Sequence, residues 1–453
     1  MKIIKIIISM VLCLHLMGCE DFLEVDTPKD QIDRQMIFSD DRMAVAAVSN
    51  IYTQLRSGGF LAGNRVGAGY LFGCYTDELE VVNPQLSSHR SFYENAVLST
   101  NTAVKDLWTA GYQQVFAVNS ILEGLEGSSA VSADIKNQLK GEALAIRAVI
   151  HLYLVQTFGS VPYIKTTDYN LNRVVAKDPV NVVMKNVIDD LLNAENLLTV
   201  NYPSVEKVRI NQTVVKAFLA RACLYAGDWQ NAEGYAAEVI AVNNNMEPVS
   251  SRFLKDSKSA LWQLKPETDG KNTAEAIEYI FQTLPAPQSK IATTLLGVFE
   301  TDDLRKKSWL KFVGDDGLNV CAYKYKIIGN SSPSQEYSVI LRIEEMFLIV
   351  AECAAERSDW DTFNTIINKV RNSAGLSDLN LQNKQEAVNA VLQERRLEFF
   401  CEFGHRFYDL KRRNRLEALK VVKNNWQSHY DLLPLPESEL LLNQNLLPQN
   451  TGY

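Results

Sequence analysis

The chain has 453 residues, of which 46% are hydrophobic and 9% aromatic, so it can bury a large core and is typical of a globular protein. Its formal net charge is −8 at pH 7, a balance that argues against a basic groove for nucleic acid. The length allows one large domain or a few small ones.

Residues 1–18 have the pattern of a lipoprotein signal peptide. Lys2 and Lys5 form a short basic region, and the mostly apolar run at 6–16 is too short to span a bilayer comfortably. The sequence LMGC that ends at Cys19 is similar to a bacterial lipobox, which predicts cleavage before Cys19 and acylation of its sulfur and amine. Several acyl chains anchor a protein stably. We expect residues 19–38 to form a tether, and an ordinary cleaved signal is the alternative.

The remaining cysteines give no sign of a disulfide framework or a metal site. Five are left once Cys13 is discarded and Cys19 is lipidated, an odd number without any C-x-x-C spacing. Those on helical patterns are expected to be small buried residues. A glycine pattern that begins at Gly67 is also rejected as a dinucleotide loop, because its third glycine comes one place late. We predict neither a metal nor a cofactor.

Helical periodicity recurs in pairs of segments, at about 39–125, 134–200, 211–243 and 338–373. Ser39 is a candidate N-cap for the first helix. At 214–242 small and large residues alternate as in a tetratricopeptide hairpin, and the fourth pair repeats this theme. We predict an all-α dominated fold of about four tetratricopeptide-like pairs. Aromatic residues of these helices are assigned to the core, and His151 is expected to be a satisfied core histidine.

Between about 244 and 337 the helical pattern gives way to a loop-rich insertion. Residues 259–264 and 276–283 are candidate short strands. Trp262 is expected to be a strand-core residue, and Trp309 to support the region of Asp303 to Arg305. Binding groups are commonly carried by loops on a rigid scaffold, so this insertion is a candidate site.

A helix from Lys384 into the stretch 394–413 is expected to organise the fold. Asn383 and Glu386 form a candidate capping pair. If the helix continues through Gly404, charges fall at i,i+4 spacing, which pairs Glu402 with Arg406, His405 with Asp409, and Asp409 with Arg413. Carboxylates among arginines are more often structural than catalytic, so we predict a buried polar network. The alternative takes Glu398, Glu402 and Asp409 as acid/base catalysts.

This stretch also resembles a known signature. Its pattern E-R-R-x-E-x-x-x-E-x-G-H-R-x-x-D-L-x-R is similar to the C-terminal signature of the RagB/SusD family of nutrient-capturing surface lipoproteins. Further motifs in family order are GEALAIRA at 141–148, GSVPYI at 159–164, VRNSAGL at 370–376 and LPLPESELLLNQNL, whose prolines argue against helix, at 433–446. The resemblance covers nearly the whole chain and implies a single monomeric body at 39–453, with the signature at 383–453.

The resemblance also implies a role. Such a protein would catch an oligosaccharide as the lid of a SusC-like TonB-dependent transporter, anchored at the outer membrane and facing the exterior. The acidic pair that follows Cys19 resembles the signal for surface export. We expect no catalytic activity and no nucleic-acid partner. A peptide ligand on the same architecture is the first alternative, and a surface glycosidase with paired carboxylates is the second.

Sugar faces pack on aromatic rings, while amides and charged groups hydrogen-bond to hydroxyls. Two loop regions, one in each half of the chain, offer both kinds of group. The candidate ligand-binding residues are Asp77, Glu78, Asn83, His89, Arg90, Phe92 and Tyr93 in the first region, and Lys271, Asn272, Tyr279 and Phe281 in the second.

Overall fold

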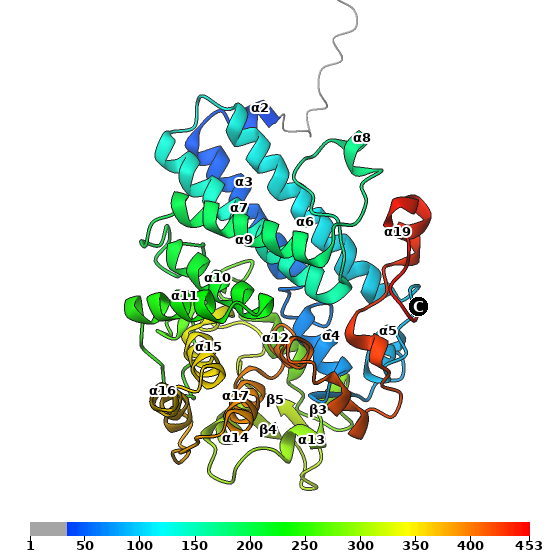
Figure 1. Cartoon of the computed structure of the whole chain (residues 1–453), viewed down its shortest axis with the longest axis vertical. Coiled ribbons are helices and arrows are strands. Elements are labelled where there is room, and N and C mark those ends of the chain that lie inside the picture. The colour runs from blue at the N-terminus through cyan, green and yellow to red at the C-terminus, as the bar shows by residue number, and fades with distance from the viewer. Residues whose placement is uncertain (1–33) are drawn as a thin grey trace, which may run out of the picture.

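The computed structural model describes residues 34–453, so the signal peptide, the lipidation site at Cys19 and most of the tether lie outside the described residues. Within that range the fold is dominated by α-helix, with few and short strands, which confirms the predicted class. None of these described helices is both long and apolar enough to cross a membrane. Figure 1 shows most long helices in the upper and left parts of the body, and the strands below them.

The long helices form four antiparallel pairs, as predicted. They are α3 (Asp41–Ser57) with α6 (Thr102–Gly127), α7 (Ala133–Phe158) with α9 (Val180–Leu197), α10 (Gln212–Ala226) with α11 (Trp229–Val242), and α15 (Ile343–Glu356) with α16 (Trp360–Ser373). The signature region supplies α17 (Lys384–Phe399) and α18 (His405–Arg412). Short helices are α2 (Arg34–Ile37), α4 (Ala68–Tyr75), α5 (Ser87–Tyr93), α8 (Tyr169–Asn172), α12 (Ala274–Tyr279), α13 (Thr293–Leu296), α14 (Leu304–Trp309) and α19 (Glu437–Leu442). Three 3₁₀ turns, Leu416–Val421, Ser428–Asp431 and Gln444–Leu446, flank α19.

The strands form three two-stranded antiparallel sheets. β1 (Leu79–Val81) pairs with β3 (Ser289–Ile291), β2 (Ala260–Leu264) with β6 (Ser338–Arg342), and β4 (Leu310–Phe312) with β5 (Val320–Ala322). Trp262 on β2 is fully buried, as predicted for a strand-core residue. Trp309 is also fully buried, and its Nε1 donates to Val249 O at 2.8 Å.

The hairpin of α10 and α11 shows why its sequence folds this way. Ala217, Ala220 and Ala236 are fully buried where the two helices approach. Gly227 ends α10 in the left-handed conformation at φ 76°, where a glycine has no Cβ penalty. Asp228 then caps α11, because its side chain accepts from the backbone N–H of Asn231. Small residues, a left-handed glycine and a capping aspartate therefore specify the pair.

The interior of α7 combines apolar packing with paired polar groups. Arg147 donates to both oxygens of Asp190 on α9, at 2.7 and 2.9 Å. His151 is fully buried, with Nδ1 2.8 Å from the carbonyl oxygen of Arg147 and its ring stacked on Tyr163. Burial lowers the pKa of His151 to about 4, so the ring is neutral at physiological pH. The prediction of a satisfied core histidine is confirmed.

Three local predictions are wrong. Asp40, and not Ser39, caps α3, since its carboxylate accepts from the N–H groups of Arg42 and Met43. Residues 276–283 do not form a strand, because Thr273 caps the short helix α12 there. The prolines of 433–446 do not exclude helix, because Pro436 is the N-cap of α19 (Glu437–Leu442), a position whose N–H would have no partner within the helix.

The continuous helix through Gly404 is also wrong, although Asn383 caps α17 as predicted. α17 ends at Phe399, and the chain then turns through Cys401 at φ 58°, Phe403 at φ 41° and Gly404 at φ 77°. Backbone of this turn packs against Gly69, where an added Cβ would lie 2.7 Å from Cys401 O. Tertiary contact therefore overrides the helical pattern.

The break changes the expected i,i+4 ion pairs. Glu402 contacts Lys324 and Arg342 instead of Arg406, and Arg406 binds Asp77. His405 Nδ1 lies 3.3 Å from the guanidinium of Arg395 and is not paired with an aspartate. Asp409 binds Arg395 and Arg412, and Arg413 binds Glu352 and Glu356.

A buried polar network nevertheless exists and has Glu398 at its centre. Its carboxylate accepts from Arg252 at 2.6 Å, Arg342 at 2.5 Å and Arg305 at 3.2 Å, and all four residues are fully buried or nearly so. Burial opposes ionisation, but the three guanidinium groups hold the pKa of Glu398 well below its usual value. The network joins α17 to β6, α14 and the segment that follows α11, which is a structural role.

Candidate functional site

The two loop regions singled out in the sequence lie against each other. β1 follows Asp77 and Glu78, and its residues pair with β3 in register Leu79 to Ile291 and Val81 to Ser289. Beyond the strands, Asn83 Nδ2 donates to Pro287 O at 3.0 Å. Segments about 200 residues apart in the sequence thus form one surface, which lies near α5, β3 and β5 in Figure 1.

Side chains strengthen this junction beneath the surface. The ring of Tyr70 on α4 lies edge-on to His89 at 5.6 Å and stacks with Tyr279 at 5.9 Å. Arg65 Nε is 3.0 Å from Glu278 Oε2, and its carbonyl oxygen is 3.2 Å from His89 Nε2. Burial lowers the pKa of His89, which favours the neutral ring.

Five of the candidate residues are buried and therefore lie below the surface rather than on it: Asp77, Glu78, Phe92, Tyr279 and Phe281. The Asp77 carboxylate accepts from Arg396 at 2.8 Å and from Arg406 at 2.9 Å. Burial opposes ionisation, yet Arg406 and Arg396 hold the pKa of Asp77 below its usual value. These contacts fix the segment that carries the exposed candidates.

The pKa of Glu78 is shifted in the opposite direction to that of its neighbour Asp77. Burial raises the pKa of Glu78 to about 8, because the only hydrogen bond that its side chain accepts among the described residues comes from Cys401 N. A carboxyl group in this state is mostly protonated at neutral pH. The two adjacent acids thus differ in charge because only one of them has arginine partners.

Asn272 and Lys271 lie just before α12 in the insertion. The Asn272 amide donates to Gly329 O and Ser331 Oγ and accepts from Gln335 N and Glu336 N. Its hydrogen-bonding capacity is used in holding the 329–336 loop. Lys271 is exposed and pairs with Glu267 at 3.1 Å.

The half-buried and exposed residues form the surface itself. On α5, Arg90 pairs with Glu94 at 2.7 Å, and Tyr93 has the Lys423 ammonium over its ring at 4.1 Å. Glu80 and Lys290 are cross-strand neighbours whose charged groups lie 3.4 Å apart. We call this surface the loop face, and it consists of Glu80, Asn83, His89, Arg90, Tyr93 and Lys290.

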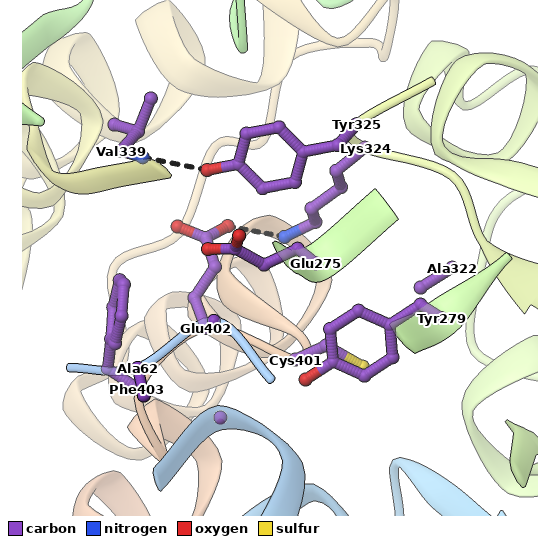
Figure 2. Close-up of a pocket in the computed structure, with 12 residues that line it drawn as sticks. Ala62, Glu275, Tyr279, Ala322, Lys324, Tyr325, Val339, Cys401, Glu402 and Phe403 are labelled. Atoms are coloured by element: carbon purple, nitrogen blue, oxygen red, sulfur yellow. Dashed lines mark hydrogen bonds and ion pairs between the residues drawn. The ribbon is translucent and has the colours of Figure 1, made fainter. Parts of the chain in front are cut away.

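A small internal cavity lies between the insertion and the signature turn (Figure 2). Its volume is about 20 Å³, enough for a water-sized molecule and far too small for a sugar ring. Glu275, Lys324 and Glu402 converge on it, and Glu402 is ion-paired with Lys324. Burial raises the pKa of Glu275 to about 7. This cavity belongs to the structural interior.

A much larger hollow lies on the surface over α6, with a volume of about 1010 Å³. The loop that contains α8 lines it, as does α19, and both stand on the same side of the body in Figure 1. We call it the side groove, lined chiefly by residues 54–58, 108–117, 162–175 and 439–446. The sequence predictions missed it because the aromatic residues of the long helix α6, which lines it, were assigned to the core. Phe116 is 52% exposed and is the exception to that assignment.

Comparisons with known proteins agree with these features. A family model described as "Starch-binding associating with outer membrane" matches residues 21–224, and the model of the SusD family matches residues 310–453. SusD-like protein P25 of Formosa agariphila is 23% identical, with 100% of both chains covered. A crystal structure of a SusD superfamily protein from Bacteroides vulgatus has a TM-score of 0.79 at 20% identity, covering 92% of this chain and 100% of that one. A laminarin-binding SusD-like protein has a TM-score of 0.75 at 19% identity, with 91% and 99% covered.

Proposed function

Since the chain belongs to the SusD/RagB family, whose members bind glycans and associate with the outer membrane, we propose that it is a glycan-binding lipoprotein of the cell surface. It captures an oligosaccharide and delivers it to a SusC-like TonB-dependent transporter, for which it acts as the lid. Cys19, the first residue after the signal peptide, carries the lipid anchor on the outer face of the outer membrane.

The observation that supports glycan capture is the convergence of the two loop regions on the loop face. The β1–β3 pairing places the Glu80–Lys290 pair close to α5, which carries Tyr93 with its half-buried ring. A flat ring beside charged and amide groups is the combination that recognises a pyranose. A SusD-like protein with the same fold is described as laminarin-binding, which supports a glycan as the class of ligand.

Affinity electrophoresis of the chain from residue 20 onward, in gels that contain laminarin or soluble starch, tests this assignment. The double variant Arg90→Ala with Tyr93→Ala removes a charge and the ring from the loop face. We expect a polysaccharide that binds the wild type to retard this variant much less. A loss of about 1.4 kcal/mol in binding free energy corresponds to an apparent affinity about ten-fold weaker. Val205→Ala, at a fully exposed position that is not part of the loop face, is the control. Unchanged retardation of the double variant would remove the loop face as the site.

The same gels separate glycan capture from the alternatives. A peptide-binding lid would have the same electrophoretic mobility with and without polysaccharide in the gel. It would instead bind peptides from a digest. A glycosidase would release shorter sugars from the gel matrix, which chromatography detects. The carboxylates of Glu398, Glu402 and Asp409, considered above as catalysts, are each held by at least one buried arginine.

The anchor and the partner have tests of their own. Cys19→Ser in cells that express the full chain is expected to abolish labelling by radioactive palmitate and to release the protein from the outer membrane. The unsubstituted chain, solubilised in mild detergent, is expected to co-purify with a TonB-dependent barrel. Retention of label on the serine variant, or purification of the chain alone, would contradict these two parts of the proposal.

A further inference from the structure

The side groove is lined by one face of α6, by the α8 loop and by α19. Thr109, Gln113 and Phe116 fall at i, i+4 and i+7 on α6 and so lie on one face of that helix, which forms the floor. The α8 loop and α19 contribute further lining residues. The volume of about 1010 Å³ is at the upper end of the range for small-molecule sites, which is about 300–1,000 Å³.

Hydrogen bonds hold the parts of the groove together. Tyr112 on α6 donates its hydroxyl proton to Pro162 O at 2.9 Å and thereby fixes the start of the α8 loop. Asn443, just after α19, donates to Val175 O at 2.8 Å at the end of that loop. Gln114 donates to Gly58 O at 2.9 Å. The groove is therefore preorganised, which lowers the entropy cost of binding a ligand.

The lining combines exposed rings with free hydrogen-bonding groups. Phe116 is 52% exposed and Tyr169 on α8 is 74% exposed, so both offer ring surface to a ligand. Within residues 34–453 no side-chain hydrogen bond or ion pair is found for five lining residues. They are Gln54, Thr109, Gln113, Arg173 and Glu439. Two amides, a hydroxyl, a guanidinium and a carboxylate suit an array of sugar hydroxyls better than they suit an apolar peptide.

The charge of the groove selects among glycans. Arg173 and Glu439 are the only charged side chains among its described lining residues, and their charges cancel. The groove therefore has no net charge, which suits a neutral ligand. A sulfated or uronic-acid polymer would be attracted by Arg173 but repelled by Glu439. Hydroxyl groups can accept from Arg173 and donate to Glu439, so a neutral sugar can use both.

We propose that the side groove is a second glycan-binding site, which takes a neutral oligosaccharide and is separate from the loop face. The inference rests on the proposed function, because it assumes that the chain captures glycans at all. In Figure 1, α19 lies between α8 and α5 on one side of the body. Two sites on one chain increase the avidity for a long polymer by raising the effective concentration at the second site.

Isothermal titration calorimetry with short neutral oligosaccharides, maltoheptaose and laminarihexaose, tests the second site through stoichiometry. The wild-type chain is expected to bind about two molecules per chain, since each site takes one. Phe116→Ala with Tyr169→Ala removes only exposed rings and is expected to reduce the stoichiometry to about one while circular dichroism stays unchanged. The loop-face variant Tyr93→Ala is expected to lose the other equivalent, and Val205→Ala to keep both.

Each outcome decides between the proposals. A stoichiometry of one that the Phe116 and Tyr169 substitutions do not change would overturn the second site and leave the proposed function standing. A stoichiometry of one that these substitutions abolish would move glycan binding from the loop face to the groove, and would overturn the claim of two sites. No heat with either oligosaccharide on the wild-type chain would count against both proposals. Binding of an apolar peptide at the groove in place of sugar would also overturn the inference.

Discussion

Substitution of Glu398 by Gln is expected to destabilise the protein strongly, because among residues 34–453 this carboxylate is the only anion shared by three buried arginines. It accepts from Arg252 at 2.6 Å, Arg342 at 2.5 Å and Arg305 at 3.2 Å. Gln keeps the shape of the side chain but removes the charge, and its NH₂ group cannot accept. Removal of one partner from a buried ion pair costs about 3–5 kcal/mol, and we expect a loss in this range.

The magnitude can be converted into a melting temperature. At about 2.1 cal/mol/K per residue, the unfolding entropy of residues 34–453 is about 0.9 kcal/mol/K. A loss of about 3–5 kcal/mol therefore lowers Tm by about 3–6 °C, which scanning calorimetry resolves easily. Glu267→Gln is the matched control: Glu267 is exposed and pairs with exposed Lys271, so solvent screens the pair and we expect Tm to stay close to that of the wild type.

The pH dependence adds a second readout for Glu398. Its pKa is lowered in the folded protein, so its contribution to stability is present above the unfolded value of about 4.3 and is lost as pH falls below it. The gap in Tm between wild type and Glu398→Gln should therefore narrow in acid. A Tm equal to that of the wild type at pH 7, with the control unchanged, would refute the view that this network stabilises the fold.

Other predictions concern a buried acid and two glycines. Burial raises the pKa of Glu78 to about 8, so the folded state binds more protons than the unfolded state above about pH 4.3, and stability should fall by up to about 1.4 kcal/mol per pH unit toward pH 8. Glu78→Gln should flatten this slope in urea titrations at pH 5 to 8; an unchanged slope would contradict it. Gly69→Ala should lower Tm, because its Cβ would lie 2.7 Å from Cys401 O. Gly234→Ala, with nothing within 4 Å in the exposed part of α11, should stabilise by about 0.5–1 kcal/mol. A higher Tm for Gly69→Ala than for Gly234→Ala would contradict the close packing of Gly69 against Cys401.

Helix pairing could be predicted because local rules and tertiary packing agree there. Gly227 and Asp228 terminate and start helices by local chemistry, and the buried alanines repeat at helical spacing. The turn after α17 could not be predicted. Cys401 and Phe403 have positive φ although neither is a glycine, since their positions depend on contacts with the distant residues Glu78 and Gly69.

The candidate site was only partly predictable for a similar reason. Asp77 and Tyr93 were equally good candidates by residue type and loop location, yet Asp77 is buried against Arg396 and Arg406 while Tyr93 is only half-buried. Burial depends on partners more than 300 residues away. The side groove was missed because Phe116 lies on α6, and the aromatic residues of this helix were assigned to the core.

The central claim is that the chain binds an intact glycan without cleaving it. Calorimetric titration tests it most directly. The chain from residue 20 onward is titrated with plant, host and microbial glycans and with a peptide digest, and each ligand that binds is recovered and analysed by chromatography. The account predicts saturable binding of one glycan class and recovery of that glycan at its original length. Cleavage of a bound glycan, or saturable binding of peptides with none of any glycan, would contradict it.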